Sequence, residues 1–275
     1  MKLDKPLVGS VALMFAGLIS VVWVASPAQA QPEPLTIAAA NSLRDVFRKV
    51  LPLFEAQHPE FVVRVVYGPS PTLRKQIVEG SPVDVFLPSL VEELDQLETS
   101  GLLIQGTKRV YAGTSLVLIT STNLPAPIGS LEDLQTVPIR RIAIGDPKTS
   151  SVGKLTLQFL NYSKLENKLK SQYVLGEHSR AILDLVANGE AEVGVVYQAD
   201  AVTSKKVKIL DTAPIGSHAP VQYGVALPWT AKNISGADSF ATFLQTPQVQ
   251  TLLQEYGFDR ITVDGGADRR GGGQP

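Results

Sequence analysis

The sequence predicts an α/β protein of two lobes, each with its own sheet, with a hinge and a cleft between them. Two observations support this fold class. Short apolar, β-branched stretches alternate with helix-like stretches along the chain after residue 30, which is typical of strands covered by helices. These strands are too many for one small sheet, and two helices near the C-terminus need a sheet to cover. We therefore expect the second lobe to be inserted into the first.

The composition is that of a globular protein, with 44% apolar and 19% charged residues in a chain of 275. Lys and Arg number 25 against 26 Asp and Glu, whereas nucleic-acid binders usually carry a basic excess. The absence of Cys excludes disulfides, thiolate metal sites and a cysteine nucleophile. The three histidines, His58, His178 and His218, are far apart in sequence, so we expect no His-rich metal site.

Residues 1–30 have the pattern of a secretory signal peptide: a short basic start, the apolar run Leu7–Val24 and the small-x-small sequence Ala28-Gln29-Ala30. We expect cleavage after about Ala30. The alternative is a retained membrane anchor, because a run of about 18 residues is near the minimum for a span. No later apolar run is as long, so we expect the mature protein to be soluble and monomeric. Residues 264–275 are rich in Gly and Arg and are expected to be a disordered tail.

The first part of the chain begins with the short apolar strand Leu35–Ala40. Apolar residues then recur at helical spacing from Leu43 to Phe54, which predicts one face of an amphipathic helix. The next expected strands are Phe61–Tyr67 and Val83–Leu87, and the next expected helices are Thr72–Glu79 and Leu90–Ser100. A glycine follows each of these two helices and would end it.

The remainder has the same alternation of strands and helices. The expected strands are Leu116–Thr120, Arg141–Ile144, Val193–Tyr197 and Val221–Leu227, and the expected helices are Gly153–Tyr162, Ser179–Asn188, Ala237–Gln245 and Pro247–Tyr256. We expect the chain to cross between lobes near Ala112–Ser115 and again near Tyr223–Val225. Lobe I would then comprise residues 31–113 plus 224–263, and lobe II residues 114–223.

Hydrogen-bond donors follow a strand and begin a helix at four places: Ser42, Ser70, the loop Gly145–Gly153, and Ser179. In open α/β sheets, ligands bind beyond the carboxyl ends of the strands, where helix N-termini present unpaired N–H groups. Four such places around one cleft would form an anion site without a formal charge. The alternative for each serine is an ordinary helix N-cap, and Asp45 behind Ser42 resembles part of a capping box.

Six stretches, in order, resemble the periplasmic molybdate-binding proteins of ABC importers. They are Leu35–Leu43, Tyr67–Leu73 with its continuation Gln76–Phe86, Arg109–Leu118, Ile142–Pro147, Glu190–Ala201 and Tyr256–Phe258. The resemblance implies the type II periplasmic binding fold, with a tetrahedral oxyanion held between two α/β lobes. It also implies export to the periplasm, and partnership with an ABC permease and its cytoplasmic ATPase.

The resemblance assigns five ligand positions. They are the hydroxyls of Ser42 and Ser70, the backbone N–H groups of Val152 and Ser179, and the phenol of Tyr197. These groups would hold molybdate or tungstate as an oxyanion, not as a bare metal cation. The implied protein binds without catalysis, needs no cofactor and has no nucleic-acid partner.

Two departures from the family pattern leave anion selectivity open. Pro69 and Pro71 flank Ser70, and Pro71 has no N–H to donate. The stretch Thr149–Val152 replaces a His-Val-Pro-Ala-like sequence and adds hydroxyls. Uncharged donors suit an unprotonated oxyanion such as molybdate, tungstate or sulfate, and disfavour phosphate, because a protonated oxygen needs an acceptor. We expect Asp146 to cap its loop instead of touching the anion.

Several alternatives stay open at this point. Tyr197 could be a core aromatic at a strand end, and His178 could either tune the site through its protonation or lie in solvent. The chain could bind sulfate or another small anion. It could also be a serine hydrolase, although Gly68-Pro69-Ser70-Pro71-Thr72 lacks the last glycine of a nucleophile elbow and His178 has no evident acid partner.

Overall fold

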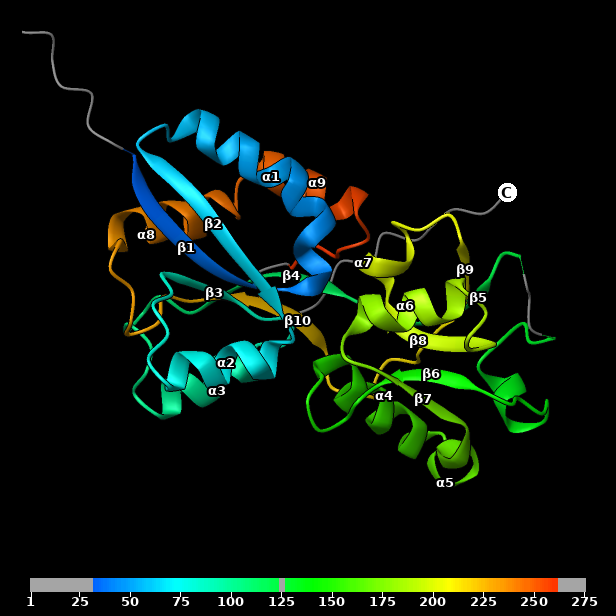
Figure 1. The fold of residues 1–275 in the computed structure, drawn as a ribbon. Coiled ribbons are helices and arrows are strands. Elements are labelled where there is room, and N and C mark those ends of the chain that lie inside the picture. The colour runs from blue at the N-terminus through cyan, green and yellow to red at the C-terminus, as the bar shows by residue number, and fades with distance from the viewer. Residues whose placement is uncertain (1–31, 124–126, 262–275) are drawn as a thin grey trace, which may run out of the picture. The chain divides into compact units, whose positions relative to one another are not determined.

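The computed structural model describes residues 32–123 and 127–261, and the predicted signal peptide and C-terminal tail lie outside this part. The first lobe is built on a parallel sheet with strand order β2-β1-β3 (Figure 1). Its strands are β1 (Glu33–Ala40), β2 (Phe61–Gly68) and β3 (Val85–Leu87). Its helices are α1 (Arg44–Gln57), α2 (Ser70–Val78), α3 (Glu92–Thr99), α8 (Ile234–Phe243) and α9 (Pro247–Glu255), and a 3-10 turn, η1 (Asn41–Leu43), precedes α1.

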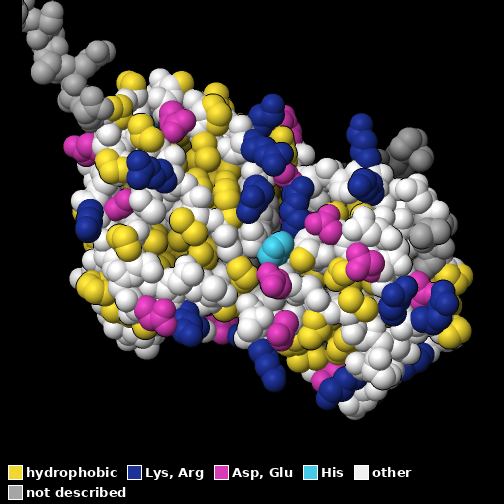
Figure 2. All heavy atoms as spheres, in the orientation of Figure 1, with side chains coloured by type: hydrophobic (Ala, Val, Ile, Leu, Met, Phe, Trp, Pro, Cys, Tyr) yellow, Lys and Arg dark blue, Asp and Glu magenta, His cyan; other side chains and the backbone are white. Residues whose placement is uncertain are grey.

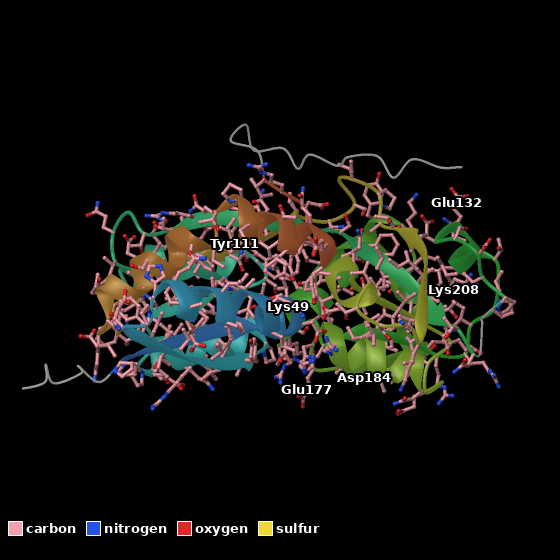
Figure 3. The ribbon with its side chains drawn as sticks, turned by 90° about the horizontal axis from the view of Figure 1, so that it is seen from above. Lys49, Tyr111, Glu132, Glu177, Asp184 and Lys208 are labelled. Atoms are coloured by element: carbon pink, nitrogen blue, oxygen red, sulfur yellow. The ribbon has the colours of Figure 1, made fainter. Side chains whose placement is uncertain are left out.

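Successive apolar side chains of β1 point to opposite faces of the sheet, which explains why helices cover both faces. Ile37 and Ala39 point into the main core with Phe47 of α1, whereas Ala38 joins a second cluster with Leu73 of α2 and Leu94 of α3. Seen from above, α8 and α9 lie beside α1 (Figure 3). The C-terminal helices therefore cover the sheet with which the chain begins, as the sequence predicts.

The second lobe contains a mixed sheet with strand order β7-β6-β8-β5-β9. Its strands are β5 (Leu116–Ser121), β6 (Ile142–Gly145), β7 (Tyr173–Gly176), β8 (Val193–Tyr197) and β9 (Val207–Thr212). Its helices are α4 (Ser151–Tyr162), α5 (Glu166–Leu169), α6 (Ser179–Ala187) and α7 (Gln198–Ala201), with the 3-10 turns η2 (Glu132–Gln135) and η3 (Lys170–Gln172). The strands β7, β6 and β8 are parallel, and β5 runs antiparallel to β8 and β9.

A pair of antiparallel strands connects the lobes. β4 (Arg109–Thr114) pairs with β10 (Val221–Val225), and Ser115 alone separates β4 from β5. Gly113 exchanges backbone hydrogen bonds with Asp259, at 2.9 and 2.8 Å, so the end of the described chain is fixed to this connection. The predicted crossing points fall on these strands, while the exact lobe limits stay a prediction.

The two-lobe α/β class is confirmed, and three strands go beyond the sequence prediction. β4 was not predicted, and neither were β7 and β9, which lie at the two edges of their sheet with half-exposed residues. The helix α2 begins at Ser70 instead of Thr72, and α4 at Ser151 instead of Gly153. Within the two described ranges, no helix is both long and apolar enough to cross a bilayer.

Candidate functional site

A small hollow lies between the two lobes, at the ends of their strands. It is lined by Ala40, Asn41, Ser42, Gly68, Pro69, Ser70, Ser89, Ser150, Ser151, Val152, His178, Ser179 and Tyr197. All five residues that the family resemblance assigns to the ligand are among them. The structure therefore brings together residues as far apart in sequence as Ser42 and Tyr197.

The hollow is the size of one small ion. The centre of a water molecule can occupy about 20 Å³ of it. A sphere of that volume, enlarged by a water radius of about 1.4 Å, has a radius of about 3 Å. Pockets for drug-sized organic ligands measure about 300–1,000 Å³. The space therefore fits a compact inorganic ion and excludes a larger organic molecule.

Helix N-termini surround this space. α2, α4 and α6 each begin at a residue that lines it, and the turn η1 before α1 contributes a fourth edge. The first N–H groups of a helix have no partner within the helix, and its N-terminus carries a partial positive charge. The site therefore attracts an anion with dipoles and N–H groups alone.

The alternative that the serines are ordinary N-caps is wrong. Leu43, Pro69 and His178 occupy the N-cap positions of α1, α2 and α6, and neither Ser42, Ser70 nor Ser179 makes a side-chain cap bond. Ser70 and Ser179 are instead the first residues of their helices.

The serine hydroxyls form bonds that hold them at the wall of the hollow. Ser42 Oγ lies 2.6 Å from the hydroxyl of Tyr223, a buried residue of β10. Ser70 Oγ lies 3.2 Å from Ser89 Oγ and accepts the Ser89 N–H at 3.0 Å. These bonds fix two lobe I hydroxyls in place before any ligand arrives.

Tyr197 connects this network to lobe II. Its hydroxyl donates to Ser89 Oγ at 3.4 Å, and its N–H donates to Ser179 Oγ at 3.0 Å. Burial raises the pKa of the Tyr197 phenol, so the group keeps its proton and stays a donor. Since Tyr197 is at the end of β8 and Ser89 follows β3, the contact joins the two lobes at the hollow.

Two glycines allow α4 to start directly at the end of β6. A Cβ on Gly153 would lie 2.4 Å from the carbonyl oxygen of Gly145, and one on Gly145 would lie 2.6 Å from the Gly153 nitrogen. Only glycine at both positions permits this approach, which places the N–H of Val152 at the hollow. Asp146 accepts the N–H of Lys148 at 2.9 Å and is a loop cap, as predicted.

Formal charge is absent from the wall of the hollow, because His178 is the one titratable lining residue besides Tyr197 among the described residues. Burial lowers the pKa of His178, and Arg44 and Arg180 lower it further, against Glu177 and Asp184, which raise it. Its Nδ1 accepts the Ala181 N–H at 3.2 Å. The ring is therefore neutral at neutral pH, half-buried, and caps α6.

Positive charge lies outside the hollow, where the two lobes meet. Figure 2 shows Lys and Arg side chains gathered there. Arg48, Lys49 and Arg180 line a neighbouring cavity together with Asp45, with which both arginines pair, and Glu255. Such a field would raise the local concentration of an anion and speed its entry.

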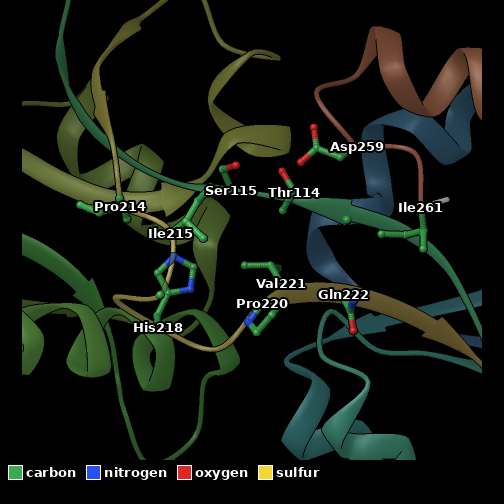
Figure 4. Close-up of a pocket in the computed structure, with 13 residues that line it drawn as sticks. Thr114, Ser115, Pro214, Ile215, His218, Pro220, Val221, Gln222, Asp259 and Ile261 are labelled. Atoms are coloured by element: carbon green, nitrogen blue, oxygen red, sulfur yellow. The ribbon is translucent and has the colours of Figure 1, made fainter. Parts of the chain in front are cut away.

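A larger cavity of about 550 Å³ lies beside the β4–β10 connection (Figure 4). Its polar groups do not converge as those of the small hollow do: the Thr114 hydroxyl already donates to the Gly257 carbonyl and accepts the Ala199 N–H. Ile215 at its rim is 79% exposed. This cavity has the size of an organic-ligand pocket but lacks the arrangement of donors, so we place the site in the small hollow.

The hydrogen bonds around Ser70 differ from those of a hydrolytic nucleophile. A serine nucleophile needs a histidine base that is itself oriented by an acid. Here the Ser70 hydroxyl is bonded to Ser89, and His178 Nδ1 is occupied by a backbone N–H. The site offers donors for an anion but no assembled catalytic triad in the described chain.

Sequence reasoning missed three residues of the site. Ser89 follows β3, so the same rule that selected Ser42 and Ser70 could have selected it. Ser151 lies in a loop rich in hydroxyls, but the family pattern assigns the donor role there to the N–H of Val152. Tyr223 had no local signal, because its contact with Ser42 joins residues far apart in the chain.

Two α/β lobes with a small hollow of hydrogen-bond donors between them are typical of extracytoplasmic solute-binding proteins. The chain belongs to the family of bacterial extracellular solute-binding proteins, whose sequence model matches residues 35–259. The family resemblance that the sequence motifs indicate is thereby confirmed.

Three known proteins similar to this chain are named for binding molybdate or sulfate. The molybdate-binding protein ModA of Haemophilus influenzae is 31% identical over 254 residues, covering 90% of this chain and 96% of its own. The periplasmic molybdate-binding protein of Azotobacter vinelandii is similar in structure, with a TM-score of 0.75, 21% identity and coverage of 83% and 100%. The sulfate-binding protein SubI of Mycobacterium tuberculosis has a TM-score of 0.72, 19% identity and coverage of 84% and 88%. The last two likenesses concern the fold.

Proposed function

We propose that this protein captures molybdate or tungstate outside the cytoplasm and delivers it to an ABC importer. The observation that carries the proposal is the hollow of about 20 Å³, walled by neutral donors from both lobes. The 31% identity to a protein named for molybdate binding supports the same ligand. The ligand would be held by the hydroxyls of Ser42 and Ser70, the N–H groups of Val152 and Ser179, and the phenol of Tyr197.

The neutral donors of the hollow explain why it would bind an unprotonated oxyanion. Each N–H or O–H satisfies one lone pair of a bare oxygen, and hydrogen bonds to a charged partner are worth about 1.5–3 kcal/mol each. A protonated oxygen would instead need an acceptor. The site thus favours molybdate, tungstate and sulfate over phosphate, and the shape of the hollow decides among the first three.

Binding would couple to closure of the cleft. The proposed ligand bridges Ser42 and Ser70 on lobe I with Val152, Ser179 and Tyr197 on lobe II, so its full set of bonds exists only in the closed form. A ligand that makes more contacts in one conformation shifts the population toward it. The closed protein would then dock, as a monomer, on a membrane permease driven by a cytoplasmic ATPase. The protein would bind without chemical turnover and without a cofactor, and its signal peptide would be cleaved after about Ala30.

Ser42→Ala and Ser70→Ala should each weaken molybdate binding by about 1–3 kcal/mol, since each removes a hydrogen bond to a charged ligand. Titration calorimetry and the ligand-induced rise in Tm measure the effect. Ser235→Ala, at an exposed position of α8, is the matched control and should bind like the wild type. The wild type is screened with molybdate, tungstate, sulfate and phosphate. A rise in Tm with sulfate alone would reassign the ligand, and no rise with any of them would contradict the proposal.

Ion pairs across the cleft should add little to affinity. Lys154 of α4 contacts Glu92 of α3 at 2.6 Å, with both side chains nearly half exposed, and exposed pairs contribute about 0–1 kcal/mol. Lys154→Met should therefore weaken molybdate binding no more than about fivefold, and high salt should remove the difference. Lys108→Met breaks ion pairs with Asp95 and Glu98 inside lobe I and should leave affinity unchanged. A larger, salt-independent loss for Lys154→Met would mean that the residue acts on the ligand itself.

A further inference from the structure

The Ser151 hydroxyl is a buried polar group whose bonding is incomplete. Ser151 is the first residue of α4, lines the hollow and is 5% exposed. Its Oγ has no hydrogen-bond partner within residues 32–123 and 127–261. The hydroxyls of Ser42, Ser70, Ser179 and Tyr197 at the same wall are all bonded to protein groups. Among these five hydroxyls, only that of Ser151 has no bond to another group in the described part of the chain.

Such a group is unfavourable unless something in the hollow pairs with it. A buried hydroxyl without a partner destabilises a protein by about 1–3 kcal/mol, and nearly all buried polar groups in native proteins are paired. A serine deeper in a helix could bond to the carbonyl four residues earlier. At the first position of α4 no preceding turn of helix offers that carbonyl. Ser151 and the neighbouring Val152 line the same hollow, so one occupant there could accept from both the hydroxyl and the N–H.

We infer that the Ser151 hydroxyl binds the captured oxyanion directly, as a side-chain donor beside the Val152 N–H. The inference rests on the proposed function and adds a donor to the five that the family pattern implies. It gives a role to the hydroxyl-rich sequence of the Gly145–Gly153 loop. A bare oxyanion has several lone pairs on each oxygen, so an additional donor strengthens binding without displacing the others.

The test compares molybdate binding by the wild type, Ser151→Ala and Ser151→Cys in titration calorimetry. Both variants should bind about ten- to a hundredfold more weakly, as expected for loss of a hydrogen bond to a charged partner. Cys keeps the approximate shape of Ser but is a weak donor, so it separates donation from packing. Thr149→Ala, at an exposed position of the same loop, is the control and should keep wild-type affinity.

Thermal unfolding of the ligand-free protein is the second measurement, and there Ser151→Ala should not be harmful. Without ligand, Ser151→Ala should have a Tm equal to or higher than the wild type, because it removes an unpaired buried hydroxyl. With saturating molybdate, its Tm should be lower than that of the wild type. Wild-type affinity in Ser151→Ala would overturn the inference, as would a loss in Ser151→Ala that Ser151→Cys fully restores. If the wild type itself does not bind molybdate, the proposed function fails, which is a separate result.

Discussion

Gly153→Ala is expected to weaken molybdate binding about a thousandfold and to destabilise the protein. The added Cβ would lie 2.4 Å from the carbonyl oxygen of Gly145 and 2.7 Å from the carbonyl carbon of Asp146. These are backbone atoms, which cannot rotate away as a side chain would. The first turn of α4 must move outward, and with it the Val152 N–H and the Ser151 hydroxyl. Losing two hydrogen bonds of about 1.5–3 kcal/mol each to a charged ligand gives the expected loss of affinity.

The same clash should lower stability by about 1–3 kcal/mol, the usual effect of overpacking. Titration calorimetry and thermal unfolding of the ligand-free protein measure the two effects separately. Gly129→Ala is the matched control, because the nearest atom to its Cβ is Asp133 Oδ2 at 3.7 Å. It should change neither property. Wild-type affinity in Gly153→Ala would mean that the start of α4 takes no part in binding.

Most of the fold could be predicted because the core elements have strong local patterns. The strand Val193–Tyr197 has the same limits in the structure, since a fully buried strand is a continuous apolar run. β7 and β9 could not be predicted in this way. Each is an edge strand whose residues are half exposed, so neither continuous apolarity nor strict alternation marks it.

The site was predictable where strand ends determine position, and unpredictable where tertiary contacts do. Ser42, Ser70 and Ser179 follow strands, and the carboxyl ends of the parallel strands bring them to one place. Whether each serine caps its helix depends on whether the helix begins at that serine or one residue later, which the sequence does not specify. The partnership of Ser42 with Tyr223, across 181 positions, depends on the chain's return through β10. No local pattern contains that information.

Asp200 is a buried carboxyl group directly behind the site. It belongs to α7, which follows Tyr197, and it is 1% exposed. Neither of its oxygens has a hydrogen-bond partner in the described residues. Burial raises its pKa to about 6, with Asp45 and Asp184 adding to the rise, although the Ser179 hydroxyl and Arg180 lower it. The folded protein therefore prefers this group protonated.

Asp200→Asn is accordingly expected to stabilise the ligand-free protein at pH 7.5. A rise of about two pKa units corresponds to about 3 kcal/mol of destabilisation. Because the folded-state pKa is raised, this destabilisation is absent below about pH 4, grows as pH increases and is complete above about pH 6. Asn keeps the shape but carries no charge, although its amide would also lack partners. A net gain of about 2 kcal/mol corresponds to roughly 5 °C in Tm.

Thermal unfolding of both proteins at pH 7.5 and pH 4.5 measures how the stability depends on the protonation of Asp200. The advantage of Asp200→Asn should shrink at pH 4.5, where the wild-type carboxyl is protonated in the folded state and partly ionised only in the unfolded chain. Glu132→Gln, at an exposed position (Figure 3), should shift Tm equally at both pH values. An Asp200→Asn advantage that is the same at pH 4.5 as at pH 7.5 would mean that packing or hydrogen bonding, and not the buried charge, separates the two proteins. The expected pH dependence instead follows from the burial of the Asp200 carboxyl group behind a site whose own wall is neutral. Protonation of Asp200 should therefore stabilise the structure that supports Ser179 and Tyr197.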